Sequence, residues 1–180
     1  IYLSPSLFEL GVLPAVDVGK SVSRVGGKAQ RATYRAVAGD LKLAYAQFEE
    51  LETFARFGAR LDESTTQIIE HGRRIRACLK QPESAPVSVA AQITVLMALT
   101  EKLFDKVPLD RMPEAEHAVR EAAAELPDAL RARFESAAKL SDADRDAIVQ
   151  IARTALSGFQ PKAEAQSSPQ APPADGKKLA

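Results

Sequence analysis

Arg24 is the residue whose setting best suits it to chemistry. It lies in the run Ser21–Gly27 (Ser-Val-Ser-Arg-Val-Gly-Gly), between β-branched residues and a pair of glycines. This pattern predicts a junction of strand and turn that presents the side chain outward. A guanidinium is planar and always charged, which suits it to binding phosphate oxygens. Most arginines in turns are solvated or structural charges, but Gly26-Gly27 would also allow a ligand or another backbone to approach closely.

The neighbouring run Gly19-Lys20-Ser21 looks like the end of a phosphate-binding P-loop. That motif requires a further glycine where this chain has Pro14. A proline lacks an N–H for the phosphate and stiffens a loop that must curl. The residues that follow, Val22 to Arg24, are typical of a strand rather than the required helix. A small nucleotide hydrolase built on Lys20 is therefore an alternative that the sequence disfavours.

Other candidate groups favour structural roles. His71 and His117 lie far apart without partners at ligand spacing, so the sequence predicts no metal site. We expect His71 to be a capping or core residue and Cys78 to be a small buried hydrophobe. The carboxylates within residues 49–52 and 142–146 are expected to form solvated helix faces rather than acid/base pairs.

The overall composition excludes several classes of protein. The 180 residues include 24 basic and 24 acidic side chains, so the formal net charge is zero, which argues against a nucleic-acid partner. The single cysteine excludes an internal disulfide and fits a reducing compartment. No apolar run approaches the roughly 20 residues that a membrane span needs, and no secretory signal is visible.

The first 27 residues combine β-favouring residues with glycine and proline, and they predict one or two short strands. Strands need neighbours to pair their backbone groups, and these are too few to close a sheet. We therefore expect them to form the end of a larger α/β domain that lies upstream. The first residue is Ile1 rather than Met, which supports this expectation.

From Lys28 onward, apolar residues recur every three or four positions, as in amphipathic helices. Gly39 is expected to separate the first two helices, Ser88 to cap the most buried one, and Ser141 with Asp144 to form a capping box. The expected helices are 28–37, 41–55, 63–80, 89–99, 114–126, 128–138 and 142–156. The sequence thus predicts a mainly α fold: a bundle of about six or seven helices in residues 28–158, after the β segment of residues 1–27. Residues 159–180 are rich in Pro, Ala, Ser and Lys and are expected to be a disordered tail.

The run that contains Arg24 resembles a signature of the α subunit of F-type ATP synthases. The resemblance extends from residue 1 to about residue 105, through several short motifs in the correct order. These motifs are Lys28-Ala29-Gln30, Leu61-Asp62, Glu70-His71-Gly72, Leu79-Lys80-Gln81 and Ala85-Pro86-Val87-Ser88-Val89. The chain is thus similar to the carboxy-terminal part of such a subunit, of a divergent or alternate branch.

This resemblance implies a role inside a larger machine. The α subunits alternate with β subunits in a hexamer around a rotating stalk, and the helical domain forms a collar near that rotor. Arg24 would reach across the interface toward the terminal phosphate of ATP held by β, as an arginine finger supplied in trans. Ser21 would help to shape the same loop. The full complex would use ATP or ADP with Mg²⁺, none of them bound by this piece alone. Its partners would include a peripheral stalk, and it would lie at the cytoplasmic face of the membrane, which it meets only through the complex.

The family also has a non-catalytic nucleotide pocket within α. By the same resemblance, Gln81 would approach the adenine and Pro14 would line the pocket. This chain departs from the family pattern at Leu13, where an arginine is expected, and at Glu83, where a second glutamine is expected. Losing a cation and gaining a carboxylate weakens attraction for ATP. The alternative is that Gln81 is an ordinary solvated loop amide.

A further alternative is a stand-alone helical adaptor or scaffold without nucleotide chemistry. It would explain the helical bundle and the neutral net charge. It leaves unexplained the strand-like segment of residues 1–27, whose exposed edges would favour aggregation.

Overall fold

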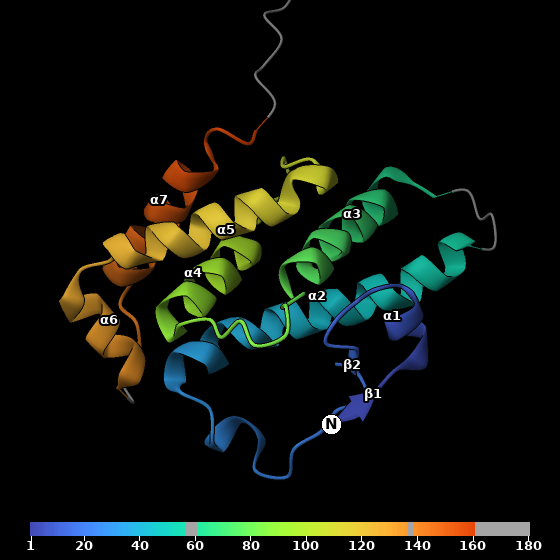
Figure 1. Cartoon of the computed structure of the whole chain (residues 1–180), viewed down its shortest axis with the longest axis horizontal. Coiled ribbons are helices and arrows are strands. Elements are labelled where there is room, and N and C mark those ends of the chain that lie inside the picture. Colours follow the sequence, from blue (N-terminus) through green and yellow to red (C-terminus); the bar gives the residue numbers. More distant parts are fainter. Residues whose placement is uncertain (57–60, 137–138, 161–180) are drawn as a thin grey trace, which may run out of the picture.

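The computed structural model describes residues 1–56, 61–136 and 139–160. Within these ranges the chain is mostly helical, with a small two-stranded sheet at its start (Figure 1). None of the helices in these ranges is long and apolar enough to cross a membrane. The elements are β1 Tyr2–Leu3, α1 Pro5–Glu9, β2 Val16–Asp17, η1 Gly26–Lys28, α2 Ala32–Arg56, α3 Glu63–Cys78, α4 Val89–Thr100, η2 Leu109–Arg111, α5 Met112–Ala122, η3 Ala123–Glu125, α6 Asp128–Glu135 and α7 Asp142–Leu156.

The predicted mainly α bundle is confirmed, with α2 to α7 as its helices in the described part of residues 28–158. The predicted break at Gly39 is wrong, because α2 is one helix that runs through this residue. A glycine inside a helix costs about 1 kcal/mol relative to alanine. Packing of α2 against both α3 and α4 outweighs that cost. The helix begins at Ala32 rather than at Lys28, which belongs to the short turn η1.

Side-chain caps fix where three helices of the bundle begin. Both predicted caps are confirmed: Ser88 accepts a hydrogen bond from the Ala91 N–H, and Ser141 forms a reciprocal capping box with Asp144. Asp62 caps α3 in the same way, by accepting from the Thr65 N–H. Each cap satisfies backbone donors that the first helical turn leaves without an intrahelical acceptor.

The core lies on both sides of α4, which packs against α2, α5 and α7. Seven of the 12 residues of α4 are buried, which confirms the prediction that it is the most buried helix. Phe48, Phe104 and Phe134 are the largest side chains that are fully buried around it. The last described residues continue this packing, since Phe159 lies against the core and the Arg111 guanidinium carbon stands 4.6 Å from the centre of its ring. The rest of the predicted tail, residues 161–180, lies outside the described residues.

The amino-terminal segment forms a small unit of its own. The predicted short strands are confirmed as β1 and β2, which pair antiparallel with Tyr2 opposite Asp17 and Leu3 opposite Val16. The helix α1 between them was not predicted. The predicted strand at Val22 to Arg24 is wrong, because these residues are irregular and lead into η1.

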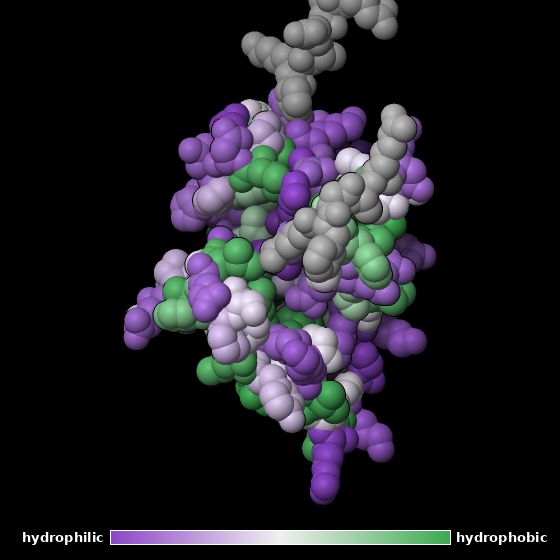
Figure 2. All heavy atoms as spheres, turned by 90° about the vertical axis from the view of Figure 1, so that its right-hand side faces the viewer, coloured by the Kyte–Doolittle hydropathy of each residue, from purple (hydrophilic) through white to green (hydrophobic). Residues whose placement is uncertain are grey.

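Exposed apolar side chains are concentrated in this segment. The face of the molecule that includes the region of α1 shows apolar patches between hydrophilic ones (Figure 2). Large exposed apolar patches often mark surfaces that contact other molecules. The large exposed apolar residues before Lys28 are Ile1, Tyr2, Leu3, Phe8, Leu10, Leu13, Val22 and Val25.

Candidate functional site

The loop of residues 21–31 carries the first candidate site. It leaves the small sheet after β2 and swings away from the helices before α2 begins (Figure 1). Ser21 fixes its start: the hydroxyl donates to the Asp17 carbonyl oxygen at 2.6 Å and accepts from the Tyr2 N–H at 3.0 Å. One side chain therefore ties the loop to both strands, which is consistent with the loop-shaping role expected of Ser21.

Arg24 lies in this loop, two residues before η1. The Ser23 hydroxyl accepts a hydrogen bond from the Gly26 N–H at 3.1 Å and closes the turn around Arg24. Gly26 has φ +52°, a left-handed conformation that only glycine adopts without strain. Arg24 is exposed and has no hydrogen bond or ion pair with any residue that the structure describes. Its guanidinium is therefore free to meet a group outside this chain.

The geometry around Lys20 does not make a phosphate cradle. The Lys20 N–H donates to Asp17 Oδ1 at 2.9 Å, and the ammonium lies 3.1 Å from Asp17 Oδ2. The hydrogen bond from that backbone N–H, more than the side-chain contact, lowers the pKa of the Asp17 carboxyl. Both donors that a phosphate would need are thus held by a carboxylate, and no helix follows directly. The disfavoured P-loop alternative gains no support here.

The backbone of Gln81 contacts Leu13, the residue before Pro14, although the two are distant in sequence. The Gln81 N–H donates to the Leu13 carbonyl oxygen at 2.9 Å, beside the cis peptide bond between Leu13 and Pro14. The Gln81 amide donates to the Ala85 carbonyl oxygen at 2.8 Å, within its own loop. Glu83 is exposed on that loop. The segments that carry the two predicted pocket residues are therefore joined through Leu13, but the Gln81 amide nitrogen is already engaged.

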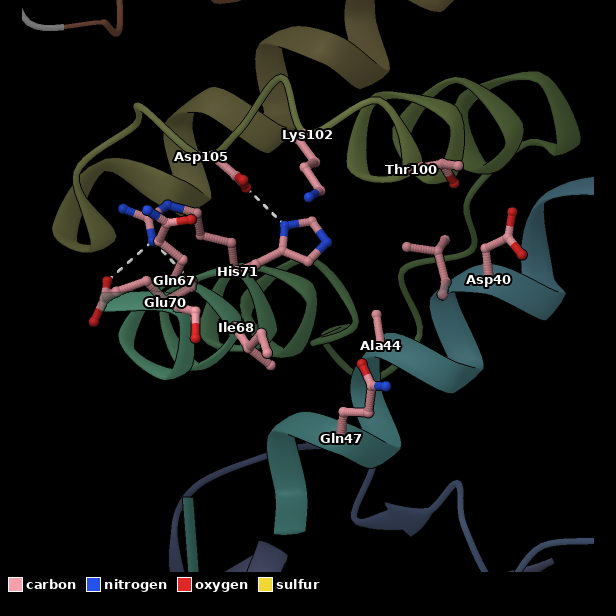
Figure 3. A pocket seen from close by; sticks show the side chains of 13 residues that line it. Asp40, Ala44, Gln47, Gln67, Ile68, Glu70, His71, Thr100, Lys102 and Asp105 are labelled. Carbon is pink, nitrogen blue, oxygen red and sulfur yellow. Dashed lines mark hydrogen bonds and ion pairs between the residues drawn. The ribbon is translucent and has the colours of Figure 1, made fainter. Parts of the chain in front are cut away.

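A second candidate site is a cavity of about 630 Å³ between α2, α3 and the end of α4 (Figure 3). His71 lies in the wall of the cavity, and its side chain is largely buried. Its Nδ1 lies 2.7 Å from Oδ1 of Asp105, which belongs to the loop after α4. Asp40 lines the cavity from α2, and Lys102 lines it from the loop that follows α4. Two of the glutamines, Gln47 and Gln67, also line it. The sequence reasoning missed this cavity, because its walls come from three separate segments.

Arg74 also lines this cavity. Its guanidinium donates twice to the Val107 carbonyl oxygen, at 3.1 and 3.0 Å, and also contacts the Glu70 carboxylate at 3.0 Å. The side chain is therefore fully used in tying the loop after α4 to α3. The Arg74 guanidinium therefore has a structural role and is not available to bind a ligand in the cavity.

Two predicted solvated carboxylates are instead partly buried in ion pairs. Glu52 lies 2.8 Å from the Arg76 guanidinium, and both side chains are less than a fifth exposed. Arg76 also stacks over the Phe48 ring, with its guanidinium carbon 4.4 Å from the ring centre. Asp144 pairs with Arg133. The prediction of fully solvated faces is wrong at these two positions, because basic residues from other helices cover them.

The described residues contain no group of three or more His, Cys, Asp or Glu side chains that could hold a metal ion. Cys78 is buried, as predicted, and burial strongly raises the pKa of its thiol. A thiol that stays protonated is a poor nucleophile and a poor metal ligand. Of the candidate groups in the described ranges, only Arg24 combines exposure, a built turn and a charge without a partner among those residues.

Comparisons with known proteins place these observations in a family. Residues 30–155 match the family described as ATP synthase alpha/beta chain, C terminal domain. The chain is 79% identical over 169 residues to ATP synthase subunit alpha 2 of Albidiferax ferrireducens, which covers 94% of this chain and 32% of that protein. It is 73% identical over 161 residues to ATP synthase subunit alpha 2 of Polaromonas naphthalenivorans, covering 89% and 31%. It is 72% identical over 159 residues to ATP synthase subunit alpha 1 of Shewanella frigidimarina, covering 88% and 31%. The chain spans about a third of the length of these relatives.

Proposed function

Because the chain belongs to the family of the ATP synthase alpha/beta chain, C terminal domain, we propose that it is the carboxy-terminal part of the α subunit of a rotary F-type ATP synthase. In that complex, ion transport is coupled to ATP synthesis or hydrolysis. The subunit itself is regulatory, and its catalytic contribution is made to a neighbour. The helical domain of residues 28–158 forms a collar around the rotor.

This proposal rests on the exposure of Arg24 and on its lack of a partner among the described residues. The side chain is exposed on a turn that Ser23 and Gly26 close, and it has no partner among the described residues. A guanidinium that reaches a phosphoryl group stabilises the charge that develops on it during transfer. Arg24 therefore acts in trans, on ATP that a β-type subunit binds with Mg²⁺. Ser21 holds the loop that carries it.

The exposed apolar surface supports the partners that this role requires. Val22 and Val25 flank Arg24 and are 81% and 60% exposed. Arginine beside exposed apolar residues is typical of the centre of a protein–protein interface. The loop thus packs against a β-type subunit in an alternating hexamer, while a central stalk and a peripheral stalk contact other parts of the complex. The complex lies at the cytoplasmic face of the membrane.

We propose that the non-catalytic nucleotide pocket near Gln81 and Pro14 is only a remnant of a binding site. The backbone hydrogen bond between Gln81 and Leu13 keeps the two segments together. The missing cation at Leu13 and the added carboxylate at Glu83 weaken its attraction for a nucleotide. We expect ATP to bind here more weakly than in an α subunit that carries the arginine and the second glutamine.

The test is the variant Arg24→Ala in the assembled complex of full-length subunits. An arginine finger contributes about 10³ to 10⁵ in rate, so multisite ATP turnover should fall by at least about 10³-fold. Nucleotide binding by the β-type subunits should stay largely intact. The matched control is Arg153→Ala, which removes an exposed arginine from α7. Normal turnover in Arg24→Ala would refute the role of Arg24.

A further inference from the structure

The segment between Asp17 and Asp40 is strongly basic, although the whole chain is neutral. It contains no acidic residue. Such a local excess of one charge favours an anionic ligand or surface. Its basic residues are Lys20, Arg24, Lys28, Arg31 and Arg35.

Two of these five charges are neutralised within the chain. Lys20 pairs with Asp17, and the Arg31 guanidinium donates to Glu135 Oε1 at 2.8 Å. Arg24, Lys28 and Arg35 are exposed, and none has an ion pair with an acidic residue in the described ranges. Three positive charges in this segment are therefore uncompensated.

The three uncompensated charges gather around the turn η1. Lys28 is its last residue, and Arg24 lies two positions before its first. A Cβ on Gly27 would stand 3.7 Å from Arg35 Cδ, so the Arg35 side chain lies against this turn. The Arg35 guanidinium donates to the Gln30 carbonyl oxygen at 3.1 Å, which holds it to the base of the loop. Lys28 is thus the second free cation of the turn that presents Arg24.

We propose that Lys28 is a second cation that this loop brings to the triphosphate bound by the neighbouring subunit. This inference rests on the proposed role of Arg24. A triphosphate carries several negative charges, and one guanidinium can neutralise only part of them. A lysine ammonium is a point charge on a flexible stem, so it attracts the phosphates without a fixed bidentate geometry. Lys28 therefore raises the affinity for the nucleotide, whereas Arg24 acts on the transition state.

These two roles predict different kinetic signatures. Interactions that are equal in the ground state and the transition state change KM, and those made only in the transition state change kcat. In the assembled complex, Lys28→Ala should raise the KM for ATP by about 3- to 10-fold and leave kcat within about twofold. The difference in KM between Lys28→Ala and the parent complex should shrink at high salt, because salt screens the attraction between the ammonium and the phosphates. Lys28→Arg should restore the KM.

The matched control is Lys42→Ala, which removes an exposed lysine from α2, outside the basic segment. It should leave both kinetic constants unchanged. An unchanged KM in Lys28→Ala would overturn the inference about Lys28. Loss of complex assembly with an unchanged KM would also overturn it, because Lys28 would then bind an acidic protein surface. An unchanged kcat in Arg24→Ala would instead overturn the proposed function, which this design tests separately.

Discussion

Gly72 in α3 lies directly against the Phe48 ring of α2. A Cβ added to Gly72 would stand 2.0 Å from Phe48 Cγ, which is far inside any real contact distance. Phe48 is fully buried and also carries the Arg76 guanidinium on its face. The absence of a side chain at Gly72 is what allows α2 and α3 to approach so closely. This explains why a glycine stands in the middle of a helix.

Gly72→Ala should therefore destabilise the fold, although alanine is the better helix former. Helix propensity favours the variant by about 1 kcal/mol, but overpacking against Phe48 opposes it, and we expect a net loss of about 1–3 kcal/mol. Urea unfolding of the full-length chain would measure the change. Gly39→Ala is the control, since a Cβ there meets nothing within 4 Å, and it should stabilise the chain by about 0.5–1 kcal/mol. A Gly72→Ala variant as stable as Gly39→Ala would contradict this account.

These glycines also show what the sequence could and could not predict. Apolar residues at helical spacing predict helices regardless of partners, so the bundle and the caps at Ser88 and Ser141 were found. The helix-breaking tendency of Gly39 is local, and tertiary packing overrides it. The close approach at Gly72 depends on Phe48, which is distant in sequence.

At the candidate site, too, local features could be predicted from the sequence and long-range contacts could not. Arg24 could be singled out because its turn is built from its neighbours, Ser23 and Gly26. The bond from the Tyr2 N–H to Ser21 spans 19 residues, and the contact between His71 and Asp105 spans 34. No local pattern encodes such pairings. The same reason explains why the burial of Glu52 against Arg76 was not predicted.

Lys102 occupies a backbone conformation that favours glycine. Its φ is +55°, and it stands just after α4. The Leu103 N–H donates to the Ala98 carbonyl oxygen at 2.9 Å and the Lys102 N–H to that of Leu99 at 3.0 Å, which is the Schellman pattern of helix ends. Lys102→Gly should stabilise the chain by about 0.5–1 kcal/mol. Lys102→Ala retains the strain and should change little in the same unfolding assay. Equal stabilities of the two variants would contradict the strain argument.

Ser21 positions the loop through its hydroxyl, which joins the Asp17 carbonyl oxygen to the Tyr2 N–H. Under the proposed function, Ser21→Ala should lower kcat in the assembled complex by about 10-fold, because small displacements of a positioned group are costly. Ser21→Thr retains the hydroxyl and should recover much of the rate. Ser6→Ala, on α1, is the control. If Ser21→Ala turned over as fast as the control, the hydroxyl would have no positioning role.

Asp144 makes stability depend on pH at the start of α7. The Arg133 guanidinium, followed by the hydrogen bonds with Ser141, lowers the pKa of its carboxyl. A lowered pKa means that the folded state favours the carboxylate. This stabilisation is complete above the unfolded pKa of about 3.9 and is lost as the pH falls through the folded value. At neutral pH, Asp144→Asn should therefore unfold at a lower temperature than the parent chain.

That difference in Tm should narrow as the pH falls below about 4, because the parent carboxyl becomes protonated and loses the same interactions. Thermal unfolding followed by circular dichroism between neutral and acidic pH would measure it. Asp146→Asn is the matched control, since it removes an exposed carboxylate from the same helix. It should show a smaller deficit in Tm at neutral pH than Asp144→Asn. A constant deficit for Asp144→Asn across the whole range would mean that its effect comes from lost packing rather than from the charge that Arg133 and Ser141 stabilise.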